Sequence, residues 1–422
     1  MIHIVKQGET INSIAAEYNV SPQRLMFDNQ IVYGSILAVG QALLVLIPSL
    51  VHYVKEGETL SSIARQYGIS LRQLLRNNPF LSDSYIYPGE YLVIDYDNRD
   101  NKEITTGGYA YPFINQDLLQ EILPYLSEIS VFSYGFLENG TLLAPKNADA
   151  ILNLAKDFYT DPILVLTPHS TSEVFDNRLI NNLIDDNVAQ DRLITQLVNE
   201  MLTKGYKGIN LDFEYIFPDN RSDYISFVQK MALELHNLGF TVSVALAPKT
   251  SPDQPGLLYE GIDYAGIGLY ADTIFLMTYE WGYKYGPPMA IAPLPNVRKV
   301  VEYALTKISP NKIILGIPNY AYDWPLPFVK GITGAETIGY IQAIDTAVRN
   351  NAEIQFDELA QSPFFEYSID GNNHIVWFED VRSIQAKFDL VKQFNLRGCG
   401  YWNLMRPFRS NYLLLNTNFN LY

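Results

Sequence analysis

The chain has 422 residues and a mass of 47.9 kDa, and 48% of the residues are hydrophobic, so it can form two or three globular domains. Its 30 basic and 46 acidic residues give a net charge of −16, which argues against nucleic acid or anionic membranes as partners. The lone cysteine, Cys399, excludes a disulfide scaffold and a cysteine-based zinc site. Residues 1–6 lack the pattern of a signal peptide, and the longest apolar stretch, 36–47, is too short to span a bilayer.

An internal repeat fills the first quarter of the chain. Residues 3–47 match residues 52–96 without a gap, at a constant offset of 52 − 3 = 49. In each copy a short alternating strand leads to Gly-Glu-Thr, and two short helical patterns follow. The second helix of the second copy is capped by Ser70, and the closing strand covers Tyr91 to Ile94. Each unit is therefore predicted to fold as β-α-α-β.

The order of these motifs resembles the LysM module, which binds glycans that contain N-acetylglucosamine. Module 1 is expected over residues 1–48 and module 2 over residues 50–95. By this resemblance the sugar lies against the loop after the first strand and the loop before the last. The residues that the resemblance implies as sugar contacts are Gly8, Thr10 and Asn29 in module 1, and Gly57, Thr59 and Asn78 in module 2. Each of them could instead only make a turn or a helix cap.

A polar stretch, residues 96–107, is predicted to be a linker between these modules and a long third region. From residue 108 to 422, eight apolar runs alternate with amphipathic helical patterns, of which residues 221–238 are the clearest. This pattern favours an α/β fold with a parallel sheet closed into a (β/α)8 TIM barrel, the alternative being an open doubly wound sheet. The eight expected strands are Tyr109–Tyr111, Ile129–Tyr134, Ile163–Thr167, Gly208–Glu214, Thr241–Ala247, Thr273–Tyr279, Ile313–Ile317 and Gly398–Trp402.

The stretch between about 325 and 390 is too long for one loop and one helix. It contains two strand-like segments, Phe364–Tyr367 and His374–Phe378, on either side of Asp370-Gly371, which favours a hairpin turn. We therefore expect a small insertion after the seventh strand.

Polar residues gather at the end of the fourth predicted strand. Asn210, Asp212 and Glu214 alternate with apolar residues, so they are expected to point into the barrel, toward the face where barrel enzymes carry their chemistry. Two adjacent carboxyl groups move their pKa values apart, which can leave one of them protonated as a general acid.

The segment 207–215 resembles the motif of glycoside hydrolase family 18, Asp-Gly-x-Asp-x-Asp-x-Glu, with Lys207 and Asn210 in place of its first two aspartates. The resemblance implies that Glu214 donates a proton to the glycosidic oxygen. Asp212 would orient the N-acetyl group of the sugar, whose oxygen attacks the anomeric carbon. Asn210 could keep a hydrogen bond to Asp212 but could not share a proton with it, which leaves the rate and pH optimum open.

Other segments match the same family at the ends of later strands. Thr278 lies between Met277 and Tyr279, Glu280 stands where the family has Asp, and Tyr279 would bind the acetamido carbonyl. Tyr320 and Asp323 lie in a matching segment after strand seven, and Trp402 would form the floor beneath the scissile sugar. Glu280, Tyr320 and Asp323 could each be structural instead. No metal and no cofactor is implied.

Two LysM modules before such a barrel resemble spore peptidoglycan hydrolases of Bacillus-type bacteria. The resemblance implies an N-acetylglucosaminidase that cuts β-1,4 bonds in spore cortex glycan fragments during germination, with weakly binding tethered modules that raise the local substrate concentration. The alternatives are a chitinase and a catalytically impaired sugar-binding protein of the spore coat. We expect a spore location, association with the cell wall, and neither nucleic acid nor membrane as partner. The sequence does not determine the oligomeric state, and a monomer is the working expectation.

Overall fold

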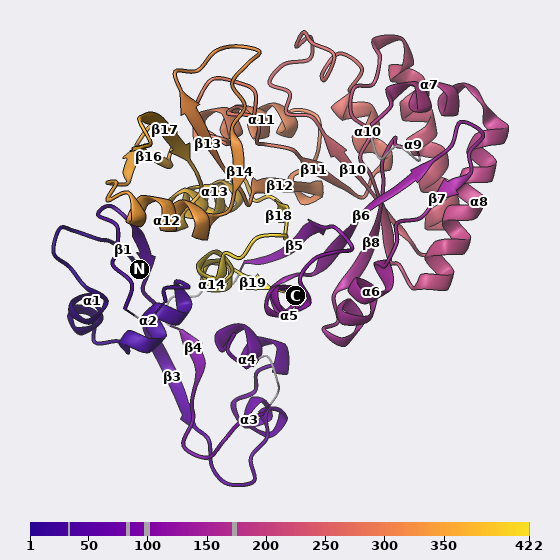
Figure 1. Cartoon of the computed structure of the whole chain (residues 1–422). Coiled ribbons are helices and arrows are strands. Elements are labelled where there is room, and N and C mark those ends of the chain that lie inside the picture. The colour runs from indigo at the N-terminus through magenta and orange to yellow at the C-terminus, as the bar shows by residue number, and fades with distance from the viewer. Residues whose placement is uncertain (33, 82–84, 97–101, 171–174, 422) are drawn as a thin grey trace.

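The computed structural model describes residues 1–32, 34–81, 85–96, 102–170 and 175–421. Figure 1 shows a large domain of strands and helices at the upper right and two small units at the lower left, the N-terminus lying in the first of these. Within the described ranges, no helix is long and apolar enough to cross a membrane.

The two N-terminal units have the predicted β-α-α-β order, and each closes with a two-stranded antiparallel sheet. Module 1 consists of β1 Ile2–Ile4, α1 Ile11–Tyr18, α2 Pro22–Asp28 and β2 Ala42–Leu44. Module 2 consists of β3 Pro48–Tyr53, α3 Leu60–Tyr67, α4 Leu71–Asn77 and β4 Tyr91–Tyr96. Each has its own small core, built in module 2 around Ile63, Leu74 and Leu92.

Eight parallel strands close into a barrel, as the sequence predicts. Each strand pairs with the next, and the circle is completed where β5 pairs with β6. In chain order the strands are β5 Glu103–Ala110, β6 Glu128–Phe136, β8 Asp161–Leu166, β9 Gly208–Leu211, β10 Thr241–Leu246, β11 Thr273–Leu276, β12 Ile313–Pro318 and β18 Gly398–Trp402. Two short strands, β7 Leu142–Leu143 and β19 Asn420–Leu421, pair with β6 and β5.

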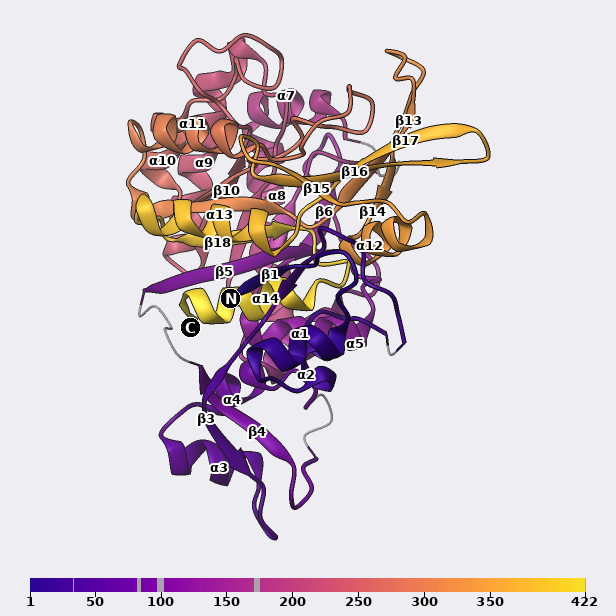
Figure 2. The same ribbon diagram turned by 90° about the vertical axis from the view of Figure 1, so that its left-hand side faces the viewer.

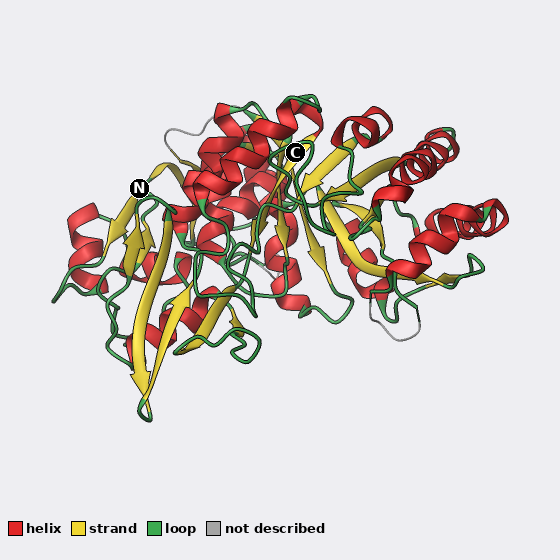
Figure 3. Ribbon diagram, turned by 90° about the horizontal axis from the view of Figure 1, so that it is seen from above, coloured by secondary structure: helices red, strands yellow, loops and turns green. Residues whose placement is uncertain are grey.

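Helices surround the barrel on its outer side, which Figure 3 shows from above. They bury apolar stripes against the strands, such as Tyr224, Phe227 and Met231 of α9, the helix predicted over 221–238. The helices are α5 Gln116–Ile122, α6 Ala148–Asp157, α7 Asn177–Asp185, α8 Asn187–Lys204, α9 Arg221–His236, α10 Tyr264–Tyr270, α11 Leu294–Leu305, α13 Val381–Gln393 and α14 Arg409–Asn418. Short 3-10 turns cover Leu123–Tyr125, Pro218–Asn220 and Pro310–Lys312.

The insertion after the seventh barrel strand is a separate five-stranded sheet with one helix. Its strand order is β14-β13-β17-β16-β15. The predicted hairpin is confirmed, because β16 and β17 are antiparallel and Asp370 and Gly371 turn between them with φ of 51° and 80°. The sheet starts earlier than the predicted position 325. Its elements are β13 Ala321–Leu326, β14 Glu336–Ile338, α12 Tyr340–Arg349, β15 Gln355–Asp357, β16 Ser362–Ile369 and β17 Asn372–Trp377.

The predicted linker, residues 96–107, needs a correction at both ends. Tyr96 is the last residue of β4, and β5 already begins at Glu103. Residues 97–101 lie outside the described part of the chain. The polar Thr105 and Thr106 concealed this strand from a reading based on apolar runs, because threonine is polar yet favours strands.

The two modules are packed on the barrel domain and are not loosely tethered, as Figure 2 also shows. In module 2, Arg76 of α4 donates to the carbonyl oxygens of Pro124 at 2.6 Å and Leu421 at 2.7 Å. In module 1, Arg409 of α14 donates to the carbonyl oxygen of Phe27 at 2.7 Å. The expectation of tethered modules was therefore wrong. These hydrogen bonds join residues that are distant in sequence and hold the modules against the barrel.

Candidate active site

The carboxyl groups of Asp212 and Glu214 follow strand β9. The strand ends at Leu211, three residues earlier than predicted, and the chain turns four residues later at Tyr215, where φ is 56°. The alternation nevertheless persists beyond the strand. Phe213 points outward and stacks on Phe227 of α9, with ring centroids 6.0 Å apart, which leaves Asp212 and Glu214 on the opposite, inner side.

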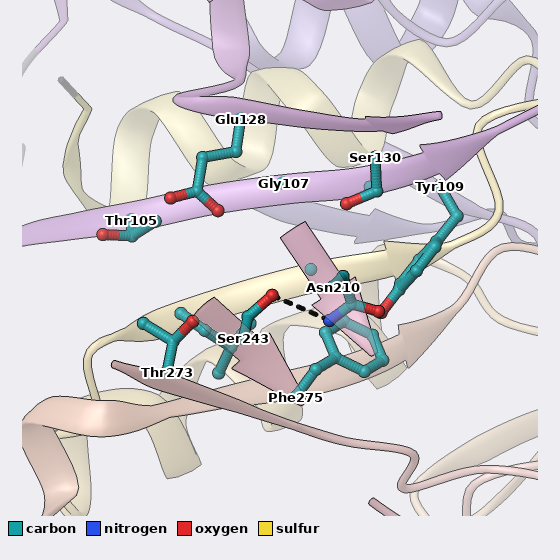
Figure 4. A pocket seen from close by; sticks show the side chains of 12 residues that line it. Thr105, Gly107, Tyr109, Glu128, Ser130, Asn210, Ser243, Thr273 and Phe275 are labelled. Atoms are coloured by element: carbon teal, nitrogen blue, oxygen red, sulfur yellow. Dashed lines mark hydrogen bonds between the residues drawn. The ribbon is translucent and has the colours of Figure 1, made fainter. Parts of the chain in front are cut away.

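Asn210 lies one step below Asp212 on the inner face of β9. Its Oδ1 accepts a hydrogen bond from the Tyr109 hydroxyl at 3.1 Å, and its Nδ2 donates to Ser243 Oγ at 2.9 Å. Figure 4 shows this group from close by. The expected hydrogen bond from Asn210 to Asp212 is not the arrangement found, because Tyr109 and Ser243 from neighbouring strands hold the amide group.

A cavity of about 30 Å³ lies beside Asn210 within the barrel, room for about one or two water molecules. Its lining includes Thr105, Glu128 and Thr273, from the first half of their strands, and Figure 4 shows their side chains converging. Burial raises the pKa of Glu128 to about 7. These polar side chains therefore line the barrel interior on the side away from the carboxyl ends of the strands, next to Asn210.

Burial and mutual charge control the protonation of the two carboxyl groups. Burial raises the pKa of Asp212 well above its ordinary value, and the negative charge of Glu214 adds to this effect. The pKa of Glu214 is also raised, first by burial and then by the charge of Glu280. Within the described part of the chain, Asp212 Oδ1 is buried without a hydrogen-bond partner. The pair is thus suited to hold a proton and to accept a hydrogen bond from a ligand.

Tyr279 completes the group around these carboxyl groups. It is 8% exposed, and its pKa is raised by burial and by the negative charges of neighbouring carboxylates, Asp212, Glu214 and Glu280. The phenol therefore stays protonated and can donate a hydrogen bond. Met277, two residues earlier on the same side of the chain, is partly buried against the core.

Glu280 and two tyrosines connect the sixth strand of the barrel with the seventh. Tyr320 donates to Glu280 Oε1, and Tyr322 donates to the same oxygen at 3.0 Å. Tyr322 was missed by the sequence reasoning, although its spacing of two from Tyr320 indicates that both face the same side. Glu280 is thereby placed next to Glu214, whose pKa it raises.

Asp323 does not join this group. Its carboxyl oxygens accept from the Tyr367 hydroxyl at 2.6 Å and from Nδ1 of His374 at 2.9 Å, with the ring proton on that nitrogen. As the neighbour of Tyr322 on β13, it points to the other face of the inserted sheet. The predicted role of Asp323 in substrate binding is therefore replaced by one in holding β13 against β16 and β17.

Trp402 ends the last barrel strand and lies among aromatic rings. Its centroid is 4.9 Å from Phe132 and 5.4 Å from Tyr109, both at steep angles, and the residue remains partly exposed. The rings hold the indole in a fixed orientation. Tyr109 and Tyr111, which the sequence reasoning passed over, thus belong to the site, and their position at the end of the first barrel strand was the available signal.

Comparison with known proteins agrees with this geometry. The family model described as glycosyl hydrolases family 18 matches residues 173–406, more than half of the chain, and the LysM domain model matches residues 3–45 and 52–95. The chain belongs to glycosyl hydrolases family 18. It is therefore a glycoside hydrolase with two LysM domains.

Relatives of this family 18 enzyme match its full length. The cortical fragment-lytic enzyme of Bacillus subtilis (strain 168) is 43% identical over 427 residues, which cover 100% of this chain and 98% of the relative. The crystal structure of the Bacillus cereus spore cortex-lytic enzyme SleL matches with a TM-score of 0.85 and 33% identity, over 100% of this chain and 98% of that one. The SleL structure from Bacillus megaterium QM B1551 gives the same values.

The LysM domains of the family 18 enzyme use two predicted sugar contacts for their own architecture. Asn29 is 2% exposed, and its Nδ2 donates to the carbonyl oxygens of Leu25 and Leu44 while its Oδ1 accepts from the amide of Leu44. Asn78 makes the same three hydrogen bonds in module 2. Both amide groups are saturated and buried, so the expectation that they contact sugar was wrong.

The Gly-Glu-Thr loops are likewise held by internal bonds. Thr10 and Thr59 cap the helices that follow them, and Ser13 and Ser62 complete a capping box in each. Gly8 and Gly57 turn with φ of 84° and 79°, a conformation that favours glycine. These residues therefore shape the loops, and the backbone and the exposed side chains of Thr10 and Thr59 can still meet a ligand.

Two exposed side chains occupy equivalent positions in the loop before the last strand. Ile36 is 78% exposed and Tyr85 is 77% exposed, and they are related by the offset of 49. The sequence reasoning missed both because it looked for identical residues. A search for equivalent large apolar residues would have found them. Over the described residues, no three His, Cys, Asp or Glu side chains are grouped to hold a metal ion.

Proposed function

We propose that the protein is an N-acetylglucosaminidase that cuts β-1,4 bonds in fragments of spore cortex glycan by substrate-assisted retaining catalysis. The observation that carries this proposal is the buried, unpartnered Oδ1 of Asp212 beside Glu214, whose pKa is raised. A buried carboxyl oxygen without a partner is costly, and a hydrogen bond from the N-acetyl group of a bound sugar removes that cost.

The proposed reaction uses the substrate's own amide as nucleophile. Glu214 donates its proton to the glycosidic oxygen, and that oxygen leaves as the acetamido oxygen forms a bond to the anomeric carbon. Asp212 accepts the amide N–H, and Tyr279 donates to the acetamido group. Water then attacks the anomeric carbon and gives a proton to Glu214, while the bond from that carbon to the acetamido oxygen breaks and the N-acetyl group re-forms. The two displacements together retain the configuration of the anomeric carbon.

Asn210 has a neutral side chain, so it adds no ionisable group next to Asp212. Its amide is held by Tyr109 and Ser243, so the inward position two residues before Asp212 carries a group that cannot exchange a proton with it. The protonation of Asp212 then depends on burial and on Glu214 alone. We infer that Asp212 and Glu214 titrate as a pair.

The substrate assignment is supported by the relatives, which are named cortical fragment-lytic and spore cortex-lytic enzymes. We infer a spore protein associated with the cell wall that acts in germination. In the LysM modules we infer sugar contact through the backbone at Gly8 to Thr10 and Gly57 to Thr59, together with Ile36 and Tyr85. Modules packed on the barrel would present the glycan in a fixed orientation.

Mass spectrometry of soluble products from spore cortex, vegetative wall and chitin oligomers tests the proposal. Wild type should release cortex fragments that end in N-acetylglucosamine, and Glu214→Gln should release them at least about 10³-fold more slowly. The exposed Glu234 on α9 offers a matched control, and Glu234→Gln should behave as wild type.

Each other outcome contradicts a stated part of the proposal. Equal product release by wild type and Glu214→Gln would overturn the catalytic role of Glu214. Preferred cleavage of chitin oligomers would make the protein a chitinase. Binding to cortex without any product would make it a sugar-binding protein of the spore coat.

A further inference from the structure

A buried lysine follows the fifth barrel strand and takes no part in the proposed reaction. Lys249 is 2% exposed and stands three residues beyond the end of β10, at the carboxyl end of the barrel where Asp212 and Glu214 lie. It belongs to a long connection, because residues 247–263 form neither helix nor strand before α10 begins. A connection of this length without regular structure is uncommon in a compact domain and usually has a function.

The ammonium group of Lys249 gathers this connection into a fixed loop. Its Nζ donates to the carbonyl oxygens of Pro252 and Tyr259, each at 3.0 Å, and to that of Ile262 at 2.9 Å. An ammonium group carries three hydrogens, so these three acceptors use every donor that it has. The lysine therefore joins three separate points of the loop and keeps no donor for a substrate.

The loop packs directly against the segment that carries Glu214. Gly261 lies so close to this segment that a Cβ atom in its place would be 1.9 Å from the carbonyl oxygen of Ile216, two residues beyond Glu214. Burial raises the pKa of Tyr215, and Glu214 and Tyr259 add to this effect, so Tyr215 lies near both. Strand β9 has already ended before Glu214, and the loop thus supplies a wall for the backbone that follows the acid.

We propose that Lys249 is a positioning residue for the general acid Glu214. Its ammonium group holds the loop, the loop fixes the backbone at Ile216, and this backbone keeps the Glu214 carboxyl group in its buried place. Burial is the first cause of the raised pKa of Glu214, so a loosened loop would admit water and let that pKa fall. This inference rests on the proposed function and adds to it the loop that maintains the acid.

Both residues have ionisable neighbours that a replacement of the lysine leaves in place. Those of Glu214 are Asp212, Tyr215, Tyr279 and Glu280. Those of Lys249 are Arg221, Asp253 and Asp263. Loss of the lysine also removes a charge, so a second variant has to move the loop while every charge stays. Gly261→Ala does so, because its added Cβ meets the Ile216 backbone.

The test measures kcat, KM and the pH profile of kcat/KM for wild type, Lys249→Met and Gly261→Ala on cortex fragments. Methionine has about the length of lysine but donates no hydrogen bond. Both variants should lower kcat about 10-fold, because the acid is misplaced, and keep KM within about twofold. The basic limb of the profile should move about half a pH unit lower, because the acid acts while protonated and its pKa falls.

A lysine at the other end of the barrel provides the matched control. Lys312 Nζ donates to the carbonyl oxygens of Gly268 and Ala271, both at 2.8 Å, just before β12 begins. Lys312→Met therefore removes a similar set of hydrogen bonds far from the acid. It should lower Tm and leave kcat and the pH profile as in wild type.

The outcomes separate this inference from the proposed function. If folded Lys249→Met or Gly261→Ala lost only stability, with kcat and the pH profile of wild type, the positioning role would be overturned and the proposed function would stand. If Lys249→Met did not fold, as judged by circular dichroism, the pH profile of Gly261→Ala would decide alone. A wild type that releases no product from cortex fragments would overturn the proposed function itself, and the role of Lys249 with it.

Discussion

The catalytic face of the barrel and the two LysM modules treat buried polar side chains in opposite ways. In the modules, Asn29 and Asn78 are buried, and every donor and acceptor of their amide groups is used within the module. On the barrel, Asp212 is equally buried, yet one of its oxygens has no partner among the described residues. The saturated asparagines indicate architecture, whereas the open oxygen of Asp212 lies beside Glu214 and can accept a hydrogen bond from a ligand.

Of the substitutions proposed, loss of a buried asparagine from a LysM module should have the strongest effect on stability. Asn29→Ala or Asn78→Ala leaves the buried strand amide and carbonyl group of Leu44 or Val93 without their side-chain partner, so we expect the affected module to lose roughly 2–4 kcal/mol of stability. Hydrogen exchange of the amides in that module should speed up, while barrel amides stay protected.

The exposed Asn12 on α1 provides the control for these variants, and Asn12→Ala should leave exchange unchanged. If Asn78→Ala instead abolished glycan binding while the module kept its protection, the asparagine would be a ligand contact and the comparison would fail.

The next effect concerns how the modules are held. Arg409 forms two hydrogen bonds of 2.8 Å with the Glu121 carboxylate, and its guanidinium lies 3.8 Å above the ring of Phe27. Glu121 belongs to the barrel, so the Arg409 side chain reaches module 1 through Phe27. Arg409→Ala should therefore cost about 2 kcal/mol at this partly buried contact and loosen the packing of module 1 on the barrel without releasing it. Limited proteolysis between the modules should then become faster.

The control for Arg409 is the exposed pair of Arg178 with Asp176. Arg178→Ala should not change the proteolysis rate, because such surface pairs contribute little. Unchanged cleavage in Arg409→Ala would show that other contacts, such as the Ile354 amide donating to the Val39 carbonyl oxygen at 2.9 Å, are enough to hold module 1 on the barrel.

A smaller effect follows from the raised pKa of Asp212, which makes its ionisation unfavourable in the folded state. Below about pH 4 the carboxyl group is protonated both folded and unfolded. As the pH rises, the unfolded chain releases this proton first, so wild type loses stability. Asp212→Asn cannot ionise and should therefore gain about 2–4 °C in Tm over wild type near pH 7, with no gain near pH 4.

Thermal unfolding of wild type and Asp212→Asn near pH 4 and near pH 7 measures the sign of this change in Tm. Asp219, an exposed carboxyl group in the following turn, supplies the control, and Asp219→Asn should show no such pH dependence. A stability gain that shrinks toward neutral pH would contradict a raised pKa for Asp212.

The sequence was sufficient for features that repeat along the chain and insufficient for those made by contacts across it. The module repeat and the eight strands were predictable because burial imposes a regular pattern, and Asp212 and Glu214 were found because they alternate with Leu211 and Phe213. The resemblance to LysM modules predicted Asn29 as a sugar contact, and no local pattern revealed its actual partner, Leu44, which lies 15 residues away. Likewise, the Arg409 contact with Phe27 spans 382 residues and leaves no local pattern.

The weakest effect should come from the exposed side chains of the modules. If the modules bind glycan through exposed groups, Tyr85→Ser and Ile36→Ser should each weaken binding to insoluble cortex about two- to fivefold without changing Tm, since each side chain is more than three-quarters exposed. The Glu214→Gln background prevents cleavage during the measurement. Tyr85→Ser should have the larger effect, because an aromatic ring offers a sugar more stacking area than an isoleucine side chain. Tyr159→Ser, on the barrel, controls for the loss of exposed apolar surface and should bind insoluble cortex as wild type does. If Tyr85→Ser and Ile36→Ser also bound as tightly as wild type, these loops would not belong to the proposed glycan contact.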